Sequence, residues 1–222
     1  QISVTIFLPH EAAFARELRR DMARDLVWFT QFYFKTDDAE PFRFKPFHVE
    51  MLRTMSDEAV ERMILREPAG YGKTTTIKHY ICWLVSWDPD VQVIYGSKNA
   101  DDAVARLASI KAELEGNAEL IADFGPFRGE VWRDDAIEVA RRTTHAKDPT
   151  VAAIGSTSSI YGKRATHFIG DDMVTLQNSG PQVEPKTRDR LLRDYNDGIK
   201  KVGYTNKRLY IRLVNTVVDR RD

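Results

Sequence analysis

The sequence predicts an α/β domain in which helices flank a mainly parallel sheet, with an N-terminal helical extension. From residue 63 onward, short apolar runs alternate with helical patterns. A glycine-rich turn joins the first run to the first helix, and a later run ends in two aspartates. The chain has 222 residues, 42 % hydrophobic and 30 % charged, which is enough for one domain with an ample core.

The N-terminal extension is assigned to residues 1–45, and the core of the single domain to residues 46–222. An amphipathic helix is expected over residues 11–34, with one apolar stripe and one basic face in solvent. The stripe comprises Phe14, Leu18, Met22, Leu26 and Phe29, and the basic face Arg16, Arg19, Arg20 and Arg24. Pro46 then opens a short helix.

The core alternates strands and helices, which favours a parallel sheet covered on both faces. Strands are expected at 63–65, 91–95, 136–140, 150–154, 166–170 and 209–214, and helices at 73–86, 99–115 and 188–201. Asn99 is placed to cap its helix. Residues 124–133 are expected to be turn-rich and residues 173–187 to form a loop.

Charge and cysteine content narrow the classes of function. The formal net charge is zero, so any contact with nucleic acid must come from local basic patches. The single cysteine excludes an intrachain disulfide framework and fits a reducing compartment. The sequence contains no apolar run of membrane length, so no membrane partner is expected.

The glycine turn resembles a phosphate-binding loop. Its glycines let backbone N–H groups face phosphate oxygens at the positive end of the next helix. Lys73 would reach the β- and γ-phosphates, and the Thr74 hydroxyl would hold Mg²⁺. The expected nucleotide-binding residues are Gly70, Tyr71, Gly72, Lys73, Thr74 and Thr75. Glu67 stands where the full motif has glycine, and the alternative is an ordinary strand-to-helix turn.

A second motif ends the strand expected at 166–170. Asp171 is assigned to Mg²⁺ and Asp172 to the attacking water as general base. The alternative is a surface turn, since paired aspartates are common there. At the end of the last strand, Asn215 and Thr216 could sense the γ-phosphate, or simply begin a turn. Together the motifs predict a P-loop NTPase core of the RecA/ASCE-like kind with ATP and Mg²⁺ as cofactors.

The order of these motifs resembles the ATPase domain of viral terminase large subunits, the motors that package double-stranded DNA into capsids. The resemblance covers nearly the whole chain after about Phe42. Its residues are Lys45–His48, Pro68–Thr74, Gly129–Trp132, Ile137–Val139, Gly155, Tyr161–Arg164, Phe168–Asp172 and Asn215–Thr216.

The resemblance implies ATP hydrolysis that drives translocation of double-stranded DNA into a procapsid. It also implies a homo-oligomeric ring, by resemblance a pentamer, on a capsid portal in the host cytoplasm, with a terminase small subunit as a further partner. His48 falls where related motors place an adenine-reading side chain, and the alternative is a helix-start residue. The nuclease domain of full-length members is not expected in this chain, so no DNA cleavage is expected.

One departure concerns charge at the γ-phosphate. Many family members carry an arginine four residues before the loop lysine, where this chain has Ala69, and Arg66 is not a simple replacement. Arg164 is therefore the candidate for an arginine finger acting on a neighbouring subunit, with Lys163 second. The alternative is an exposed basic turn.

Two other functions remain open. The glycine loop also resembles that of superfamily-2 helicases, which would require a second RecA-like domain and would separate strands. A nucleotide-binding interaction module without hydrolysis is the second alternative, favoured by Ala69 and by aspartate rather than glutamate at residue 172. Steady ATP turnover separates this module from both enzymes.

Overall fold

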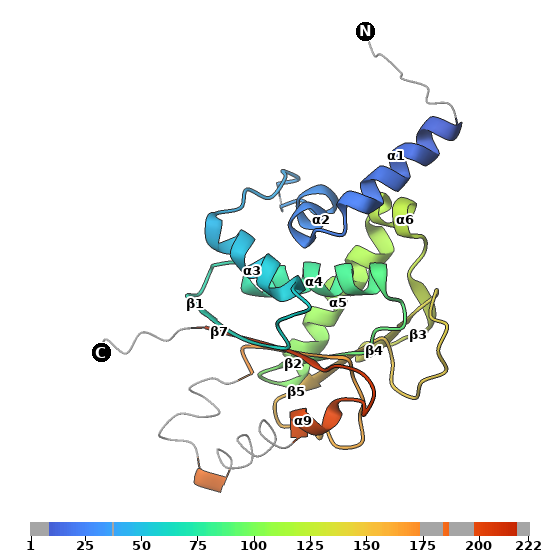
Figure 1. The fold of residues 1–222 in the computed structure, drawn as a ribbon. Helices are drawn as coiled ribbons and strands as arrows, with labels where there is room; N and C mark the ends of the chain where they lie inside the picture. Colours follow the sequence, from blue (N-terminus) through green and yellow to red (C-terminus); the bar gives the residue numbers. More distant parts are fainter. Residues whose placement is uncertain (1–8, 37, 174–183, 187–197, 217–222) are drawn as a thin grey trace.

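In the computed structural model, which describes residues 9–36, 38–173, 184–186 and 198–216, one seven-stranded sheet organises the chain (Figure 1). Its strands are β1 (Arg62–Glu67), β2 (Val93–Ser97), β3 (Arg128–Trp132), β4 (Ala136–Val139), β5 (Val151–Gly155), β6 (His167–Asp171) and β7 (Tyr210–Thr216). They lie in the order β1-β7-β6-β2-β5-β4-β3. The first five strands in this order are parallel, whereas β4 and β3 are antiparallel to their neighbours.

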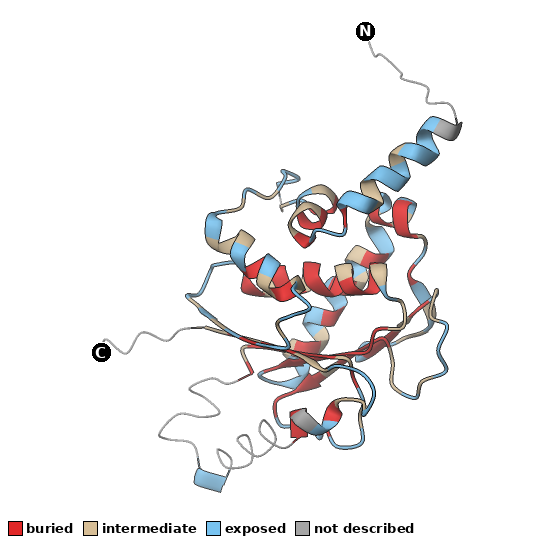
Figure 2. Ribbon diagram, in the orientation of Figure 1, coloured by how far each residue is buried: buried red, intermediate tan, exposed pale blue. Residues whose placement is uncertain are grey.

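Helices cover both faces of the sheet. They are α1 (Pro9–Met22), α2 (Leu26–Tyr33), α3 (Pro46–Ser56), α4 (Lys73–Trp87), α5 (Ala100–Gly116), α6 (Ala118–Phe124) and α9 (Ile199–Val202). In Figure 1, α3 and α4 lie on one side of the sheet and α9 on the other. The larger hydrophobic core contains residues of α2, α3, α4, α5 and α6 together with residues of the sheet. The smaller core packs α9 against β2, β6 and β7. Figure 2 shows buried residues along α4 and the central strands.

The predicted alternation of strands and helices is confirmed over the described residues, including the mainly parallel sheet. Asn99 caps α5 as expected, because its side chain accepts a hydrogen bond from the backbone N–H of Asp102 at 2.8 Å. The loop expected at 173–187 and the helix expected at 188–201 lie largely outside the described residues, which include α9 at the end of the latter.

One expected turn region is instead regular structure. Residues 124–133 contain the end of α6 and all of β3. β3 pairs with β4 as an antiparallel hairpin at the edge of the sheet, and this pairing keeps the segment extended. Gly125 ends α6 with φ of 86°, a conformation that favours glycine.

The predicted N-terminal helix is wrong in two respects. It is broken into α1 and α2, because Asp25 caps α2 by accepting a hydrogen bond from the Trp28 N–H at 2.9 Å. The apolar stripe is also not continuous with the core: Phe14, Leu18 and Met22 are exposed, and only the α2 part is buried. Figure 1 shows α1 projecting from the body of the fold.

The arginine face of α1, expected in solvent, is the face that contacts the fold. Arg19 donates two hydrogen bonds to the Asp123 carboxylate, at 2.8 and 2.6 Å. Arg16 donates to the Asp123 carbonyl, and Arg20 lies over the rings of Trp87 and Phe124. α1 is therefore attached to α6 and α4 through arginine contacts.

A buried arginine links β7 to α3. Arg212 is 1 % exposed. Its guanidinium donates to the carbonyls of Met55 at 3.0 Å, Asp57 at 3.5 Å and Glu61 at 3.3 Å. These acceptors lie at and just beyond the end of α3, where carbonyls have no partner within the helix. Arg212 thus acts as a C-terminal cap supplied by a strand.

Among the described helices, none has the length and apolar character needed to cross a bilayer.

Candidate functional site

The glycine loop lies between β1 and α4, at the edge of the sheet where the parallel strands end. Gly70 and Gly72 have φ of 81° and 72°, in the left-handed region, and Gly72 is the N-cap of α4. Glycine adopts this conformation without the strain that a Cβ would cause. The loop therefore places backbone N–H groups at the positive end of a fifteen-residue helix, which suits an anion.

Lys73 opens α4 and folds back over the loop. It is 6 % exposed, and its Nζ donates to the carbonyls of Glu67 at 3.0 Å and Pro68 at 2.6 Å. Among the described residues its ammonium pairs with no carboxylate. A buried ammonium whose hydrogen-bond partners are carbonyls lacks a charged counterpart, which a phosphate would supply.

Asp171 ends β6 beside the start of α4. Its carboxylate is buried and lies close enough to the Thr74 hydroxyl for the two to interact. Burial raises the pKa of Asp171, and the hydroxyls of Thr74 and Tyr95 only partly offset this. Oδ1 of Asp171 is buried and completes no hydrogen bond among the described residues. A hydroxyl and an incompletely satisfied carboxylate oxygen are ligands that suit Mg²⁺.

β7 joins the glycine loop to the acidic strand. It lies between β1 and β6, with Thr216 in register with Glu67 and Val214 in register with Asp171. The ends of all three strands therefore meet at one edge, and the structure brings Lys73, Thr74, Asp171 and Thr216 to that edge. This is the juxtaposition that the two sequence motifs require.

Asp172 is held against Thr216. Its φ of 48° is left-handed, which is uncommon outside glycine. The Asp172 carboxylate accepts hydrogen bonds from the Thr216 backbone N–H and, at 2.8 Å, from its hydroxyl. Each carboxylate oxygen retains a second lone pair, so Asp172 can still accept a hydrogen bond from a water. Asn215, the other predicted sensor, is in register with Arg66 on β1.

His48 connects α3 to the glycine loop. Its Nδ1 accepts the Lys45 N–H at 3.1 Å, and its ring also bonds the Tyr71 backbone. Burial lowers the pKa of His48. The structure therefore places His48 as a helix-start residue that also supports the loop. The ring of Phe47 lies 5.2 Å from that of Tyr71, and Tyr71 is 42 % exposed. Adenine reading by His48 stays a prediction.

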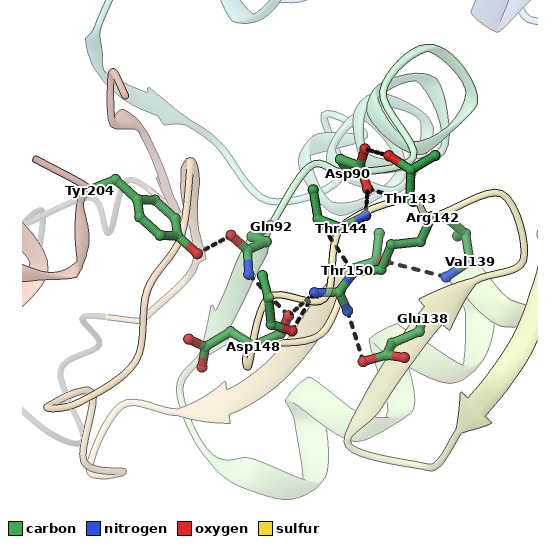
Figure 3. Close-up of polar contacts among 11 residues, drawn as sticks. Asp90, Gln92, Glu138, Val139, Arg142, Thr143, Thr144, Asp148, Thr150 and Tyr204 are labelled. Atoms are coloured by element: carbon green, nitrogen blue, oxygen red, sulfur yellow. Dashed lines mark hydrogen bonds and ion pairs between the residues drawn. The ribbon is translucent and has the colours of Figure 1, made fainter. Parts of the chain in front are cut away.

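Arg164 lies at the other edge of the sheet, just before β6 begins. It is exposed, its backbone N–H donates to Asp148 at 3.0 Å, and its guanidinium donates to the Lys201 carbonyl. Figure 3 shows how Asp148 is fixed in turn: its carbonyl accepts from Gln92, whose side chain also bonds Tyr204. Arg164 is therefore at the opposite edge of the sheet from the glycine loop of its own chain.

Three further residues named in the sequence analysis lie in or beside the glycine loop. Arg66 is exposed on β1, and Ala69 is exposed in the glycine loop. Thr75 follows Thr74 in the first turn of α4 and is partly buried. Lys73 brings a positive charge to the loop, and the start of α4 adds the positive end of a helix.

Comparison with known proteins supports the fold. No family model matches the chain, and no curated protein matches it. Among solved structures, the crystal structure of the HK97 bacteriophage large terminase superposes with a TM-score of 0.63 at 16 % sequence identity. The match covers 87 % of this chain and 37 % of that chain. The fold is terminase-like. The chain spans just over a third of the length of the terminase that it matches.

One residue at the candidate site was not predicted. Tyr95, near the end of β2, donates from its hydroxyl to Oδ2 of Asp171 at 2.9 Å. From the sequence, Tyr95 is predicted only to be the last residue of a strand. A tyrosine at a strand end is a weak signal, because its contact with Asp171 depends on the pairing of β2 with β6.

Proposed function

We propose that this chain is an ATP-hydrolysing motor domain of the terminase large subunit type, which uses Mg²⁺ and drives double-stranded DNA into a procapsid. The observation that carries the proposal is the meeting of Lys73, Thr74 and Asp171 at one edge of the sheet. The terminase-like fold supports it, since this edge is where open α/β sheets bind ligands.

Each residue has a role that follows from its position. The loop N–H groups and Lys73 would neutralise the phosphates, and their charge would count most where negative charge grows during phosphoryl transfer. Thr74 and Asp171 would hold Mg²⁺, which supplies Lewis-acid stabilisation of the phosphate oxygens when bound. Asp172 would orient the attacking water, and its bond to Thr216 would link that water to β7.

The direct test is steady ATP turnover with Mg²⁺. Lys73→Ala should lower turnover by about 10²–10³-fold, because the lost ammonium stabilises the transition state. Lys78→Ala is the matched control on the same helix, since Lys78 pairs with Glu113 away from the loop. Equal turnover by wild type and Lys73→Ala would contradict the proposal. Because the finger can come from a neighbouring copy, turnover is measured across a concentration series that spans assembly.

Partners follow from the same proposal. We infer a homo-oligomeric ring, a pentamer by resemblance, on a capsid portal in the host cytoplasm, together with a terminase small subunit. Arg164 would act on the neighbouring copy, because it is exposed and remote from its own loop. Arg164→Ala should then abolish turnover by the assembled ring while leaving nucleotide binding unchanged. Loss of nucleotide binding instead would contradict the assignment.

DNA contact is tested by salt. Duplex DNA should stimulate turnover, and its affinity should fall steeply as salt rises, because phosphate contacts release counterions. Salt-independent binding would count against translocation. Strand separation coupled to turnover would favour the helicase alternative.

A nucleotide-binding module without hydrolysis is the second candidate function. It is favoured by the bonds from Thr216 to both carboxylate oxygens of Asp172, which restrain the predicted base. This module would bind ATP in a Lys73-dependent manner and show no turnover at any concentration or with DNA.

A further inference from the structure

We propose that Tyr95 is a positioning residue that determines which oxygen of Asp171 faces the divalent cation, and that it thereby favours Mg²⁺ over Ca²⁺. This inference rests on the proposed metal–nucleotide site. Tyr95 itself would touch neither the metal nor the nucleotide. Its effect would pass through one hydrogen bond.

The sheet register brings the two side chains together. β2 and β6 are parallel neighbours, with Ser97 opposite Asp171. Tyr95 lies two residues before Ser97, so it is on the same face of the sheet and diagonal to Asp171. A tyrosine is long enough to span this diagonal. The Tyr95 hydroxyl reaches Oδ2 of Asp171 at 2.9 Å, and the residue is 1 % exposed.

This bond makes the two oxygens of Asp171 unequal. Oδ2 is occupied by the phenol, whereas Oδ1 is buried and has no hydrogen bond among the described residues. The Thr74 hydroxyl lies beside the same carboxylate. A buried carboxylate oxygen without a partner is costly, and it is the atom that a cation between Thr74 and Asp171 would satisfy.

The inequality has a consequence for metal choice. Mg²⁺ is small, takes octahedral geometry and is commonly held by one oxygen of a carboxylate. Ca²⁺ accepts more ligands and often takes both oxygens of one carboxylate. Because Oδ2 already accepts from Tyr95, Oδ1 is the oxygen with no hydrogen bond among the described residues, and coordination through this oxygen suits Mg²⁺. Removing the hydroxyl frees Oδ2 and allows both oxygens to turn toward a larger ion.

A competing explanation is that Tyr95 is only a core residue whose hydroxyl needs an acceptor. The chain contains a matched example: Tyr33 donates to Oδ2 of Asp123 at 2.8 Å and is equally buried. Tyr33→Phe is therefore the control for loss of a buried tyrosine–aspartate bond away from the site.

The experiment measures metal binding to the whole 222-residue chain. Mn²⁺ is titrated in the presence of ATP, with free Mn²⁺ followed by electron paramagnetic resonance, and is then displaced by Mg²⁺ or Ca²⁺. Tyr95→Phe should weaken Mg²⁺ about 10–100-fold, as loss of an outer-shell partner does, and weaken Ca²⁺ less. Tyr33→Phe should match wild type.

The outcomes separate this inference from the proposed function. Unchanged Mg²⁺ and Ca²⁺ affinities in Tyr95→Phe, with normal Mn²⁺–ATP binding by wild type, would overturn the role of Tyr95 alone. Wild-type binding of Mn²⁺–ATP that does not depend on Lys73 would overturn the site and this inference with it.

If Tyr95→Phe does not fold, 3-fluorotyrosine placed at residue 95 keeps the hydroxyl. Its ¹⁹F signal should shift with Mg²⁺–ATP and not with ATP alone. The absence of a metal-dependent shift would contradict the proposal.

Discussion

Two buried tyrosine–aspartate pairs in this chain differ in what completes them. Tyr33 and Asp123 join α2 to α6, and Arg19 adds two hydrogen bonds and a positive charge to the same carboxylate. Tyr95 and Asp171 join β2 to β6, and among the described residues no cation contacts that carboxylate. The first cluster is complete within the chain, and the second is not.

The difference appears in the pKa values of the two acids. Burial alone would raise the pKa of Asp123, but the hydrogen bonds from Arg19 and Tyr33 outweigh it, and the net pKa is lowered. For Asp171, burial is the largest cause and the net pKa is raised. A carboxylate whose partners are all in the chain stabilises the fold, whereas one that lacks a cation costs stability until a ligand supplies it.

The largest expected effect breaks the complete pair. Asp123→Asn should lower the free energy of unfolding by about 2 kcal/mol, because Arg19 and Tyr33 lose a charged acceptor while Arg19 remains partly solvated. Urea unfolding followed by circular dichroism measures it. Asp135→Asn is the control, since its ion pair with Arg133 is exposed and should contribute little. An equal loss in the control would show that the Asp123 cluster is not special.

The opposite sign is expected at the incomplete pair. Asp171→Asn should raise the free energy of unfolding by about 1 kcal/mol at neutral pH without metal, since a neutral amide avoids burial of an unpaired charge and can still accept from Tyr95. The same variant should lose Mg²⁺-dependent nucleotide binding. A destabilised Asp171→Asn would mean that the carboxylate is stabilising in the folded chain.

The pH dependence sharpens this contrast. Asp123 has a folded pKa below the unfolded value of 3.8, so its contribution is complete above 3.8 and is lost as pH falls further. Asp171 has a folded pKa above 3.8, so its destabilising contribution grows as the pH rises through the folded pKa and disappears as the pH falls toward 3.8. The stability gap between wild type and Asp171→Asn should therefore close at higher pH than the gap for Asp123→Asn. Closure in the reverse order would contradict both assignments.

The smallest expected effect tests how α1 is attached. Leu18 is 51 % exposed, whereas Arg19 beside it bonds Asp123. Leu18→Ser should change the free energy of unfolding by less than about 0.5 kcal/mol, as exposed substitutions usually do. Thermal unfolding of Leu18→Ser and Arg19→Ser, compared in parallel, measures the contrast. A larger loss for Leu18→Ser would indicate that the apolar face is buried.

The sequence predicts the sheet well because its signals are local. Apolar runs and glycine turns mark the strands, and Asn99 marks a helix start. The orientation of α1 is different, since its apolar spacing continues into α2 and suggests one helix. The orientation of α1 is decided by the contacts of its arginines and of Arg24 with Asp123 and Trp87. These two residues lie later in the sequence, so local spacing does not reveal the contacts.

In the candidate site, too, some contacts follow from local sequence motifs and others depend on the order of the strands. The motifs around Lys73 and Asp171 predict which residues share an edge, because the carboxyl ends of parallel strands coincide. The order of the strands adds what the motifs lack: β7 between β1 and β6 brings Thr216 to Asp172, and β2 beside β6 brings Tyr95 to Asp171. These contacts depend on register between strands that are distant in sequence.

The guanidinium of Arg212 supports both β7 and α3, two elements of the candidate site. It holds the last turn of α3 against the middle of β7, while His48 at the first turn of α3 bonds the glycine loop. A shift of β7 by one residue would move the Arg212 guanidinium and would break its hydrogen bonds to all three carbonyls. The strand that carries Thr216 and the helix that carries His48 are therefore joined by the side chain of one buried arginine.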